Sequence, residues 1–343
     1  MNDMKIQSIG FLIFDGFPMA CLTSMIEPLR AANEISGQDA FSWTLLAETE
    51  DRVRSSAGVR FEPDVTLSDA PRPDYLILLS PPMGGFENSK SGYGVLRDFA
   101  RHGSILGGIS GGIFPLVRSG VMAGQRVSVH WCYDAAFRSE FSEVTASNQV
   151  IEVSARSCTA SGATAAFDLS LQLIEDSLGS NVATEVACWF QHPLMRGKDV
   201  QQSVPTYRQR STDATLPPVV AKAVAIFAAN LSDPVSVAKV ASDVGVSARQ
   251  IERSFKKETG QSPSHYYRSI RMNAARQLVM YSKDSMAQIA MQVGYGSTTL
   301  MVQHYRNAFG ISPQEDRRRI NLYRVQDNIL SLIHISEPTR LRS

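Results

Sequence analysis

The chain has 343 residues, of which 43% are hydrophobic and 20% are charged, with four cysteines and a formal net charge of +1. This length suits two domains, each with a core of its own. The four cysteines are too few for a disulfide scaffold and show neither C-x-x-C nor Cys/His ligand spacing, which argues against a cysteine-based metal site. No apolar run approaches the length of a membrane span, so we do not expect a membrane-spanning protein.

The small net charge hides a split between two parts of the chain. Residues 1–213 hold 17 Lys and Arg against 24 Asp and Glu, which gives −7, whereas residues 214–324 hold 15 against 7, which gives +8. An acidic module is therefore joined to a basic one. The first residues lack the anatomy of a signal peptide, so we expect a cytoplasmic protein whose cysteines are buried free thiols.

Strands and helices alternate along the acidic part. The predicted strands are residues 5–14, 43–47, 74–79 and 105–109, and the predicted helices are residues 19–33, 94–101, 111–119, 163–178 and 182–190. This order predicts an α/β domain with a flavodoxin-like parallel sheet and helices on both faces. Ligands bind such sheets beyond the carboxyl ends of the strands, where the loops 15–18, 80–86 and 110–112 should meet.

The third loop carries a nucleophile-elbow pattern. Gly108-Ile109-Ser110-Gly111-Gly112 is a G-x-S-x-G sequence that follows a strand and opens a helix. One interpretation is a serine hydrolase, for which Asp168 and His192 occur in a suitable order but supply no evident base beside Ser110. The other is a non-catalytic Ser110 that donates a hydrogen bond to a ligand or caps the following helix.

Residues 6–193 resemble the class I glutamine amidotransferase-like, PfpI-like domain that GlxA-like regulators carry. The resemblance rests on Gly10-Phe11-Leu12 with Asp15-Gly16-Phe17, on Glu27 to Asn33, on the elbow from Gly107 to Gly112, and on Val129-His130-Trp131. Enzymes of that superfamily have a cysteine at the elbow, where this chain has Ser110. The resemblance therefore implies no catalysis and no cofactor, but a former active-site cleft that senses a small molecule.

Regulators of this group respond to amines and amino-acid derivatives, so the resemblance implies a quaternary amine or a cationic amino acid as effector. We predict Glu27 as its anionic partner and Trp131 and Phe17 as cation–π partners. The alternatives are that Glu27 pairs with Arg30 or with an arginine distant in sequence, and that Trp131 belongs to the core. The other predicted site residues are Met83, Gly84, Ser110, Gly111 and His130.

A polar linker and a tail flank the basic part. We place the sensing and dimerisation domain at residues 1–195, the linker at 196–216 and the second domain at 217–324. The linker cations, which either contact phosphates or stay solvated, are Arg196, Lys198, Arg208 and Arg210. Residues 325–343 form a tail, in which LSLIHISEPTR (330–340) resembles a translated sequencing adapter and is excluded from the fold.

Two short helices joined by a glycine turn open the core of the basic part. The first has an apolar stripe at helical spacing, formed by Val237, Val240, Ala241 and Val244. After Gly245, a capping box of Ser247 and Gln250 starts the second helix. Its inward residues are Ala248, Ile251 and Phe255, and its outward residues are Arg249, Gln250, Arg253, Lys256 and Lys257. This is a helix-turn-helix with a basic outer face.

The same pattern recurs about fifty residues later. A second apolar stripe comprises Met286, Ile289, Ala290 and Val293, with a capping box of Ser285 and Gln288 and a turn at Gly294. Ser297, Met301 and Tyr305 then match Ser247, Ile251 and Phe255. In this second copy, Gln303 replaces an arginine and Asp316 replaces an aromatic residue. We therefore expect the second copy to bind DNA more weakly than the first or with another specificity.

Residues 264–282 form one predicted helix between the two motifs. A helix of that length spans about 30 Å, close to the roughly 34 Å between successive major-groove faces of DNA. Residues 217–320 thus resemble the DNA-binding domain of AraC-family regulators. The predicted base-contacting residues are Arg249, Gln250 and Arg253 in the first copy and Thr298, Thr299 and Gln303 in the second, with Lys256, Lys257 and Arg306 on phosphates.

These features together predict a ligand-responsive transcription regulator, an activator of a catabolic operon. Its expected partners are double-stranded operator DNA, a small effector, RNA polymerase and a second copy of the chain. The first alternative is a hydrolase or amidotransferase that uses Ser110 and is tethered to DNA. The second is a constitutive DNA-binding protein with a vestigial cleft.

Overall fold

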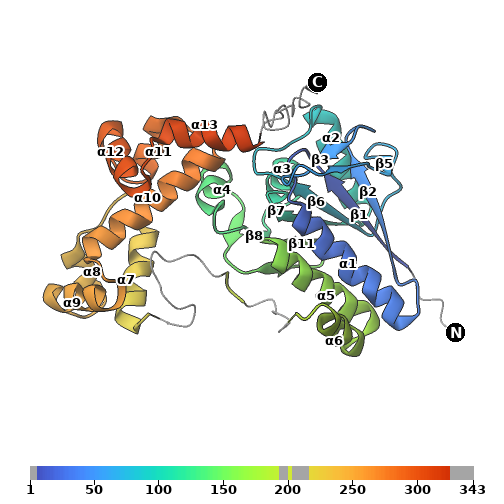
Figure 1. Ribbon diagram of the computed structural model, residues 1–343, viewed down its shortest axis with the longest axis horizontal. Helices are drawn as coiled ribbons and strands as arrows, with labels where there is room; N and C mark the ends of the chain where they lie inside the picture. Colours follow the sequence, from blue (N-terminus) through green and yellow to red (C-terminus); the bar gives the residue numbers. More distant parts are fainter. Residues whose placement is uncertain (1–5, 193–199, 203–215, 325–343) are drawn as a thin grey trace, which may run out of the picture. The chain divides into compact units, whose positions relative to one another are not determined.

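The computed structural model describes residues 6–192, 200–202 and 216–324, with the backbone alone for residues 319–324. The chain divides into two compact units, Met1–Tyr207 and Arg208–Ser343 (Figure 1). The predicted tail lies outside the described residues, as do all four linker cations, Arg196, Lys198, Arg208 and Arg210.

The first unit is built on a seven-stranded sheet in the order β10-β11-β7-β6-β1-β2-β5. Its strands are β1 (Gln7–Ile13), β2 (Phe41–Ala47), β5 (Val65–Thr66), β6 (Tyr75–Ser80), β7 (Ile105–Ser110), β10 (Ile151–Val153) and β11 (Ser157–Ala160). The edge strand β10 pairs antiparallel with β11, and the other neighbours in this sheet pair in parallel. The predicted α/β fold with a mostly parallel sheet is therefore confirmed.

Helices cover both faces of this sheet (Figure 1). On one face, α1 (Met19–Ser36) packs against α5 (Ala163–Leu178) and α6 (Ser180–Trp189). On the other, α2 (Ser89–Arg101) and α3 (Ile113–Arg118) contact the central strands. Phe11 and Leu12 of β1 are both fully buried although they point to opposite faces, which explains why the central strands are apolar throughout.

The segment after α3 forms a small sheet of its own. Strand β8 (Arg126–Ser128) ends before His130 and pairs in parallel with β9 (Thr145–Ser147). Helix α4 (Asp134–Glu140) lies between them in sequence. His130 and Trp131 therefore occupy a loop. A third small sheet pairs β3 (Val53–Arg54) with β4 (Arg60–Phe61).

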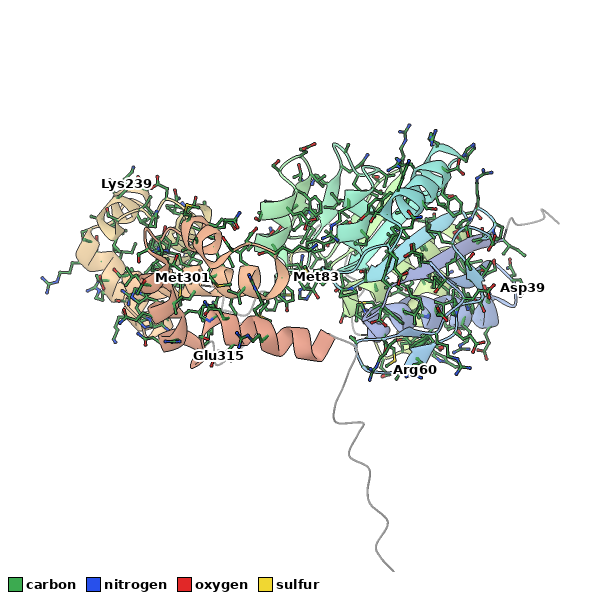
Figure 2. All side chains as sticks on the ribbon, turned by 90° about the horizontal axis from the view of Figure 1, so that it is seen from above. Asp39, Arg60, Met83, Lys239, Met301 and Glu315 are labelled. Carbon is green, nitrogen blue, oxygen red and sulfur yellow. The ribbon has the colours of Figure 1, made fainter. Side chains whose placement is uncertain are left out.

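The described part of the second unit is helical. Its elements are α7 (Pro218–Ala229), α8 (Val237–Asp243), α9 (Ala248–Thr259), α10 (Pro263–Tyr281), α11 (Met286–Gln292), α12 (Thr298–Phe309) and α13 (Pro313–Arg324). The pairs α8–α9 and α11–α12 are the two predicted helix-turn-helix motifs. Figure 2 shows Lys239 of α8 at the surface of this unit, where its ammonium group bonds Asp243.

The local signals at the helix ends are present as predicted. Both capping boxes form, at Ser247 and Gln250 and at Ser285 and Gln288. Ser297 precedes α12 but makes no capping bond with its side chain. The buried stripes consist of Ile251 and Phe255 in α9 and of Met301 and Tyr305 in α12. The prediction that Ala248 points inward was wrong: this first residue of α9 is exposed, because the apolar stripe begins three residues later.

The two motifs reach similar packing with different chemistry. In the first, Phe227 stacks on Tyr267 with 4.2 Å between ring centroids, and Phe255 contacts Tyr266 edge-on at 5.5 Å. In the second, Arg276 replaces Phe227, Tyr305 replaces Phe255, and Asp316 replaces Tyr266. The Asp316 carboxylate, 4% exposed, accepts from the Arg276 Nε at 2.8 Å and from the Tyr305 hydroxyl at 2.8 Å. The departure at Asp316 is thus a change of core, not of an exposed face.

Candidate DNA-binding surface and effector cleft

Helix α9 presents the basic face that its sequence predicted. Arg249, Arg253, Lys256 and Lys257 are all exposed, and the Lys257 ammonium lies 3.3 Å from the Glu258 carboxylate. Gln250 is exposed as well, but its Oε1 accepts from the Ser247 backbone N–H at 2.8 Å. Bidentate recognition of adenine needs both the oxygen and the nitrogen of that amide. Gln250 therefore has to leave the capping box before it can read a base in this way.

Helix α12 presents a different surface. A shallow groove of about 480 Å³ runs along it, lined by Thr298, Thr299, Val302, Gln303, Arg306 and Asn307. Four of these were predicted from register with the first motif. Val302 and Asn307 were missed, because Val302 corresponds to the acidic Glu252, and because Asn307 lacks the charge of its counterpart Lys257. This surface has one cationic side chain, Arg306, whereas α9 has four. Any hydrogen bonds it makes to a partner therefore come mainly from hydroxyl and amide groups.

Buried contacts join the two motifs through α10. The Arg271 guanidinium donates to the carbonyls of Val293 and Gly294 at 2.7 and 2.6 Å, and lies 4.2 Å from the ring centroid of Tyr295. Burial lowers the pKa of Arg271 from its usual value. One turn earlier on α10, the Tyr267 hydroxyl donates to the Asn230 carbonyl. The 19 residues of α10 span about 28 Å at 1.5 Å per residue, so the helix acts as a rigid spacer between the motifs.

In the first unit, the three predicted loops meet at the carboxyl edge of the sheet. Ser80 and Ser110 are register partners at the ends of β6 and β7. A Cβ atom on Gly111 would lie 2.3 Å from the Ser80 carbonyl oxygen, so the two loops touch through backbone. Gly16, in the first loop, approaches Pro81 at 3.4 Å on the same basis. Met83, labelled in Figure 2, is 39% exposed on the second loop.

Ser110 occupies the strained position of an elbow. Its φ of 56° lies in the left-handed region, which costs a residue with a Cβ atom about 1–2 kcal/mol. The residue is 7% exposed. Helix α3 begins after Gly112 and has no side-chain cap, so the interpretation of Ser110 as a helix cap is wrong.

His130 lies at the same edge of the sheet, beside Cys132. Its ring approaches Gly162, which follows β11, the strand beside β7. The Cys132 backbone N–H donates to Nδ1 at 3.2 Å and the Cys132 Sγ lies 2.8 Å from the same nitrogen, which favours the neutral ring with its proton on Nε2. Burial lowers the pKa of His130 and favours this neutral form. An imidazole with Nδ1 already accepting and Nε2 protonated is not arranged to take the proton of Ser110.

Aromatic side chains surround His130. The ring centroids of Trp131 and Tyr133 each lie 5.4 Å from that of His130, and Tyr133 contacts Phe114 of α3 at 6.2 Å. Trp131 is half-buried, not part of the closed core. Sequence reasoning missed Tyr133, although its place in the run His130-Trp131-Cys132-Tyr133 is the signal that could have identified it.

Two predicted cleft residues lie elsewhere. Glu27 is on the solvent side of α1, with its side chain 48% exposed and its carboxylate 3.1 Å from the Arg30 Nε. The buried stripe of α1 includes Met25 and Leu29, and the helical period turns Glu27 away from it. Phe17 is fully buried against Phe61 at 5.2 Å and belongs to the core. Neither residue is available as a cleft contact.

Asp168 and His192 form a pair away from the elbow. The His192 Nε2 lies 3.0 Å from the Asp168 carboxylate, and its ring packs on Phe167 at 4.8 Å. Asp168 is on the buried side of α5 and His192 follows α6, so the pair belongs to the helical layer over one face of the sheet. The sequence order Ser-Asp-His therefore does not assemble a triad at Ser110.

The cysteines only partly match the expectation of buried thiols. Burial raises the pKa of Cys21 and of Cys158 to about 12, so both are inert thiols. Cys132 is half-buried and Cys188 is exposed. No cluster of three or more His, Cys, Asp and Glu side chains in the described ranges could hold a metal ion. None of the helices in those ranges is long and apolar enough to cross a membrane.

Comparisons with known proteins agree with both halves of this architecture. Residues 7–176 match the model of the DJ-1/PfpI family, and residues 240–319 match a helix-turn-helix domain model. The chain is 34% identical over 314 residues to the HTH-type transcriptional regulator GbdR of Pseudomonas aeruginosa, covering 91% of this chain and 84% of that protein.

Two further relatives align over nearly their whole length. The HTH-type transcriptional regulator ArgR of Pseudomonas aeruginosa is 31% identical over 314 residues, covering 91% of this chain and 93% of that protein. The HTH-type transcriptional regulator GlxA of Rhizobium meliloti is 26% identical over 323 residues, covering 93% and 98%. In each relative the similarity extends across both units.

Proposed function

Because this chain belongs to the AraC family of helix-turn-helix transcription regulators, with an N-terminal domain of the DJ-1/PfpI type, we propose a division of labour between its units. Residues 217–324 bind operator DNA, and residues 1–195 sense an effector and dimerise, with 196–216 as linker. The protein acts in the cytoplasm, on the nucleoid, as an activator of a catabolic operon that recruits RNA polymerase.

The DNA-binding proposal rests on one observation. The second helices of the two motifs, α9 and α12, are exposed on one side, and α10 separates the motifs. We assign base contacts to Arg249 and Arg253 of α9 and to Thr298, Thr299 and Gln303 of α12. Lys256, Lys257 and Arg306 neutralise phosphates, and Ser247 and Ser297 lie at the helix starts nearest the DNA backbone. Gln250 is a base contact only in a complex that opens its capping box.

The test compares one base-reading and one phosphate-binding residue on a site selected from random duplex DNA. Arg253→Ala should cost about 1–3 kcal/mol at one base position and relax the preference there. Lys257→Ala, its matched control on the same helix, should weaken all sequences alike and reduce the slope of log affinity against log salt by about one. An unchanged sequence preference in Arg253→Ala would remove Arg253 from the readout.

We propose that the cleft beside Ser110 binds a quaternary amine. Three aromatic side chains, His130, Trp131 and Tyr133, lie together at the edge of the sheet and support this proposal. The carboxylate that was predicted as the anionic partner, Glu27, instead pairs with Arg30. A quaternary ammonium has no N–H to satisfy and binds aromatic faces through cation–π attraction. A cationic amino acid would need a carboxylate that the assigned contacts do not include. The other contacts are Met83, Gly84, Ser110 and Gly111.

Thermal unfolding of the full chain tests this effector class. Glycine betaine or choline at a hundred times Kd should stabilise the protein by about 2.7 kcal/mol, whereas arginine and neutral amino acids should not. Trp131→Phe should retain part of the shift and Trp131→Leu should lose it. A shift with arginine alone would overturn the quaternary-amine assignment.

We also propose that the cleft is not catalytic. The support is the replacement of the elbow cysteine by Ser110, together with the contacts of His130 Nδ1 with Cys132, which favour a ring with its proton on Nε2. The observation that favours the enzyme alternative is the strained φ of Ser110, which nucleophile elbows share.

A further inference from the structure

A short segment near the end of the first unit lies beside the loop that carries His130 and Trp131. Val200–Gln202 is held on the first unit by the Val150 N–H, which donates to the Val200 carbonyl at 2.8 Å, and by its own Gln202 N–H, which donates to Asn148 at 2.8 Å. Gln201 and Gln149 form an antiparallel bridge between these two bonds. We call Val200–Gln202 the strap. Thirteen residues of sequence separate it from Leu216, which leads into α7.

The Gln202 side chain fastens the strap to the backbone on either side of His130. Its Oε1 accepts from the Trp131 N–H at 2.9 Å. Its Nε2 donates to the Val129 carbonyl at 2.8 Å and to the Gln149 carbonyl at 3.2 Å. The acceptor and both donors of this amide are therefore used, which fixes its orientation as well as its position. No other side-chain type of this size offers one acceptor and two donors in one plane.

This arrangement places the effector contacts and the start of the connection to the DNA-binding unit on one short stretch of backbone. The side chains of His130 and Trp131 belong to the proposed effector contacts, while the peptide groups next to them hold Gln202. A ligand that moves either side chain by rotating its backbone breaks or bends the hydrogen bonds of the strap. Since the bonds are few and directional, a small rotation suffices to weaken them.

We propose that the strap couples effector binding to DNA binding by docking and undocking through Gln202. The inference rests on the proposed effector site at His130 and Trp131. In thermodynamic terms, the effector binds the docked and undocked forms with different affinity and shifts their populations accordingly. The two forms differ in how much of the chain before α7 is anchored to the first unit, and hence in the freedom of the DNA-binding unit.

Three variants separate the role of the Gln202 side chain from that of the strap backbone. Gln202→Leu keeps the approximate size of the side chain and removes its hydrogen bonds, and Gln202→Glu keeps the acceptor for Trp131 but replaces both donors. Gln201→Ala changes the neighbouring exposed side chain and leaves the backbone bridge in place. Thermal unfolding of each full-length variant establishes that it is folded before any comparison.

The first readout needs no effector. Hydrogen exchange should be at least tenfold faster at the Trp131 and Val150 amides in Gln202→Leu than in wild type, and affinity for the selected DNA site should differ at least threefold, in either direction. Gln201→Ala should match wild type in both measurements. Unchanged amide exchange in Gln202→Leu would overturn the docking, and faster exchange with unchanged DNA affinity would overturn the coupling.

The second readout uses glycine betaine as the probe. In wild type it should change DNA affinity, and in Gln202→Leu the ratio of affinities with and without it should approach one, while its thermal stabilisation of the protein persists. A wild-type ratio in Gln202→Leu would overturn the proposal. If glycine betaine fails to stabilise wild type, the effector assignment fails, and the effector-free arm still decides the role of the strap.

Discussion

Ser110 combines the backbone of a nucleophile with surroundings that do not activate it. Its left-handed φ persists because Gly111 and Gly112 pack against the backbone of the neighbouring strand end, where a Cβ atom would lie 2.3 Å from Ser80 and 1.9 Å from Leu78 oxygens. The conformation is thus maintained by packing of the loop, whether or not the hydroxyl has a chemical task.

We expect Ser110→Ala to leave operator affinity unchanged and stability within about 1 kcal/mol, because alanine pays the same left-handed penalty as serine. If the hydroxyl contacts the effector, the variant should lose a severalfold part of effector affinity and no more. Titrations of DNA and of glycine betaine measure both. Labelling of the wild type, but not of Ser110→Ala, by a fluorophosphonate would instead favour the hydrolase.

Tyr305 belongs to the polar core of the second motif. Burial, and then its hydrogen bond to Asp316, raise the pKa of Tyr305 far above its usual value. Below pH of about 10, where the phenol of the unfolded chain is also protonated, its stabilising contribution is complete. As pH rises further, the unfolded chain releases this proton first, so the contribution declines.

Tyr305→Phe should therefore cost about 1–3 kcal/mol at pH 7, because Asp316 loses a donor inside the core. The difference in unfolding free energy between wild type and variant should shrink as pH rises above about 10. Urea unfolding at pH 7, 9 and 10.5 measures it. A difference that stays constant across this range would mean that the hydroxyl is not held as described.

The two helix-turn-helix elements are alike in backbone and unlike in context. Gly245 and Gly294 have φ of 76° and 72° at equivalent turns. A Cβ atom on Gly245 would meet no atom within 4 Å, whereas one on Gly294 would lie 2.5 Å from the Leu231 carbonyl oxygen. The turn of the second motif is packed against the connection between α7 and α8, and that of the first is open.

Gly245→Ala should lower the free energy of unfolding by about 1–2 kcal/mol, because alanine is strained in the left-handed region. Gly294→Ala should lower the free energy of unfolding by about 1–3 kcal/mol more, because the added methyl group also clashes with Leu231 and Pro234. Chemical denaturation of the two variants measures the difference. Equal costs would show that the packing around Gly294 yields without strain.

At the scale of the whole molecule, charge is divided between the units. Residues 214–324 carry +8 while the full chain carries +1. We expect a fragment of residues 214–324 to bind random duplex DNA more tightly than the full chain at 0.05 M salt. The advantage should narrow at 0.5 M, where the Debye length is only about 4 Å. Fluorescence anisotropy at both salt concentrations checks this, and an equal affinity at low salt would show that the acidic unit does not restrain non-specific binding.

The sequence by itself determined the elements and their kind. Helical periodicity, the serine caps and the turn glycines are local signals, so the two helix-turn-helix motifs could be located to within a residue or two of the helices α8, α9, α11 and α12. The alternation of strands and helices likewise predicted a parallel sheet and the edge at which its loops meet. Register between the two motifs was enough to nominate exposed residues of α9 and α12 for the proposed DNA-binding surface.

Tertiary structure alone decided which side chains meet. Glu27 and Phe17 were misplaced because the cleft depends on the phase of α1 and on the packing of Phe61, 44 residues from Phe17 in sequence. Asp168 with His192, Asp316 with Arg276, and Gln202 with Trp131 are contacts over 24, 40 and 71 residues. Such pairs leave no periodic trace in the sequence, because they depend on how whole elements pack and not on the spacing of residues within one element.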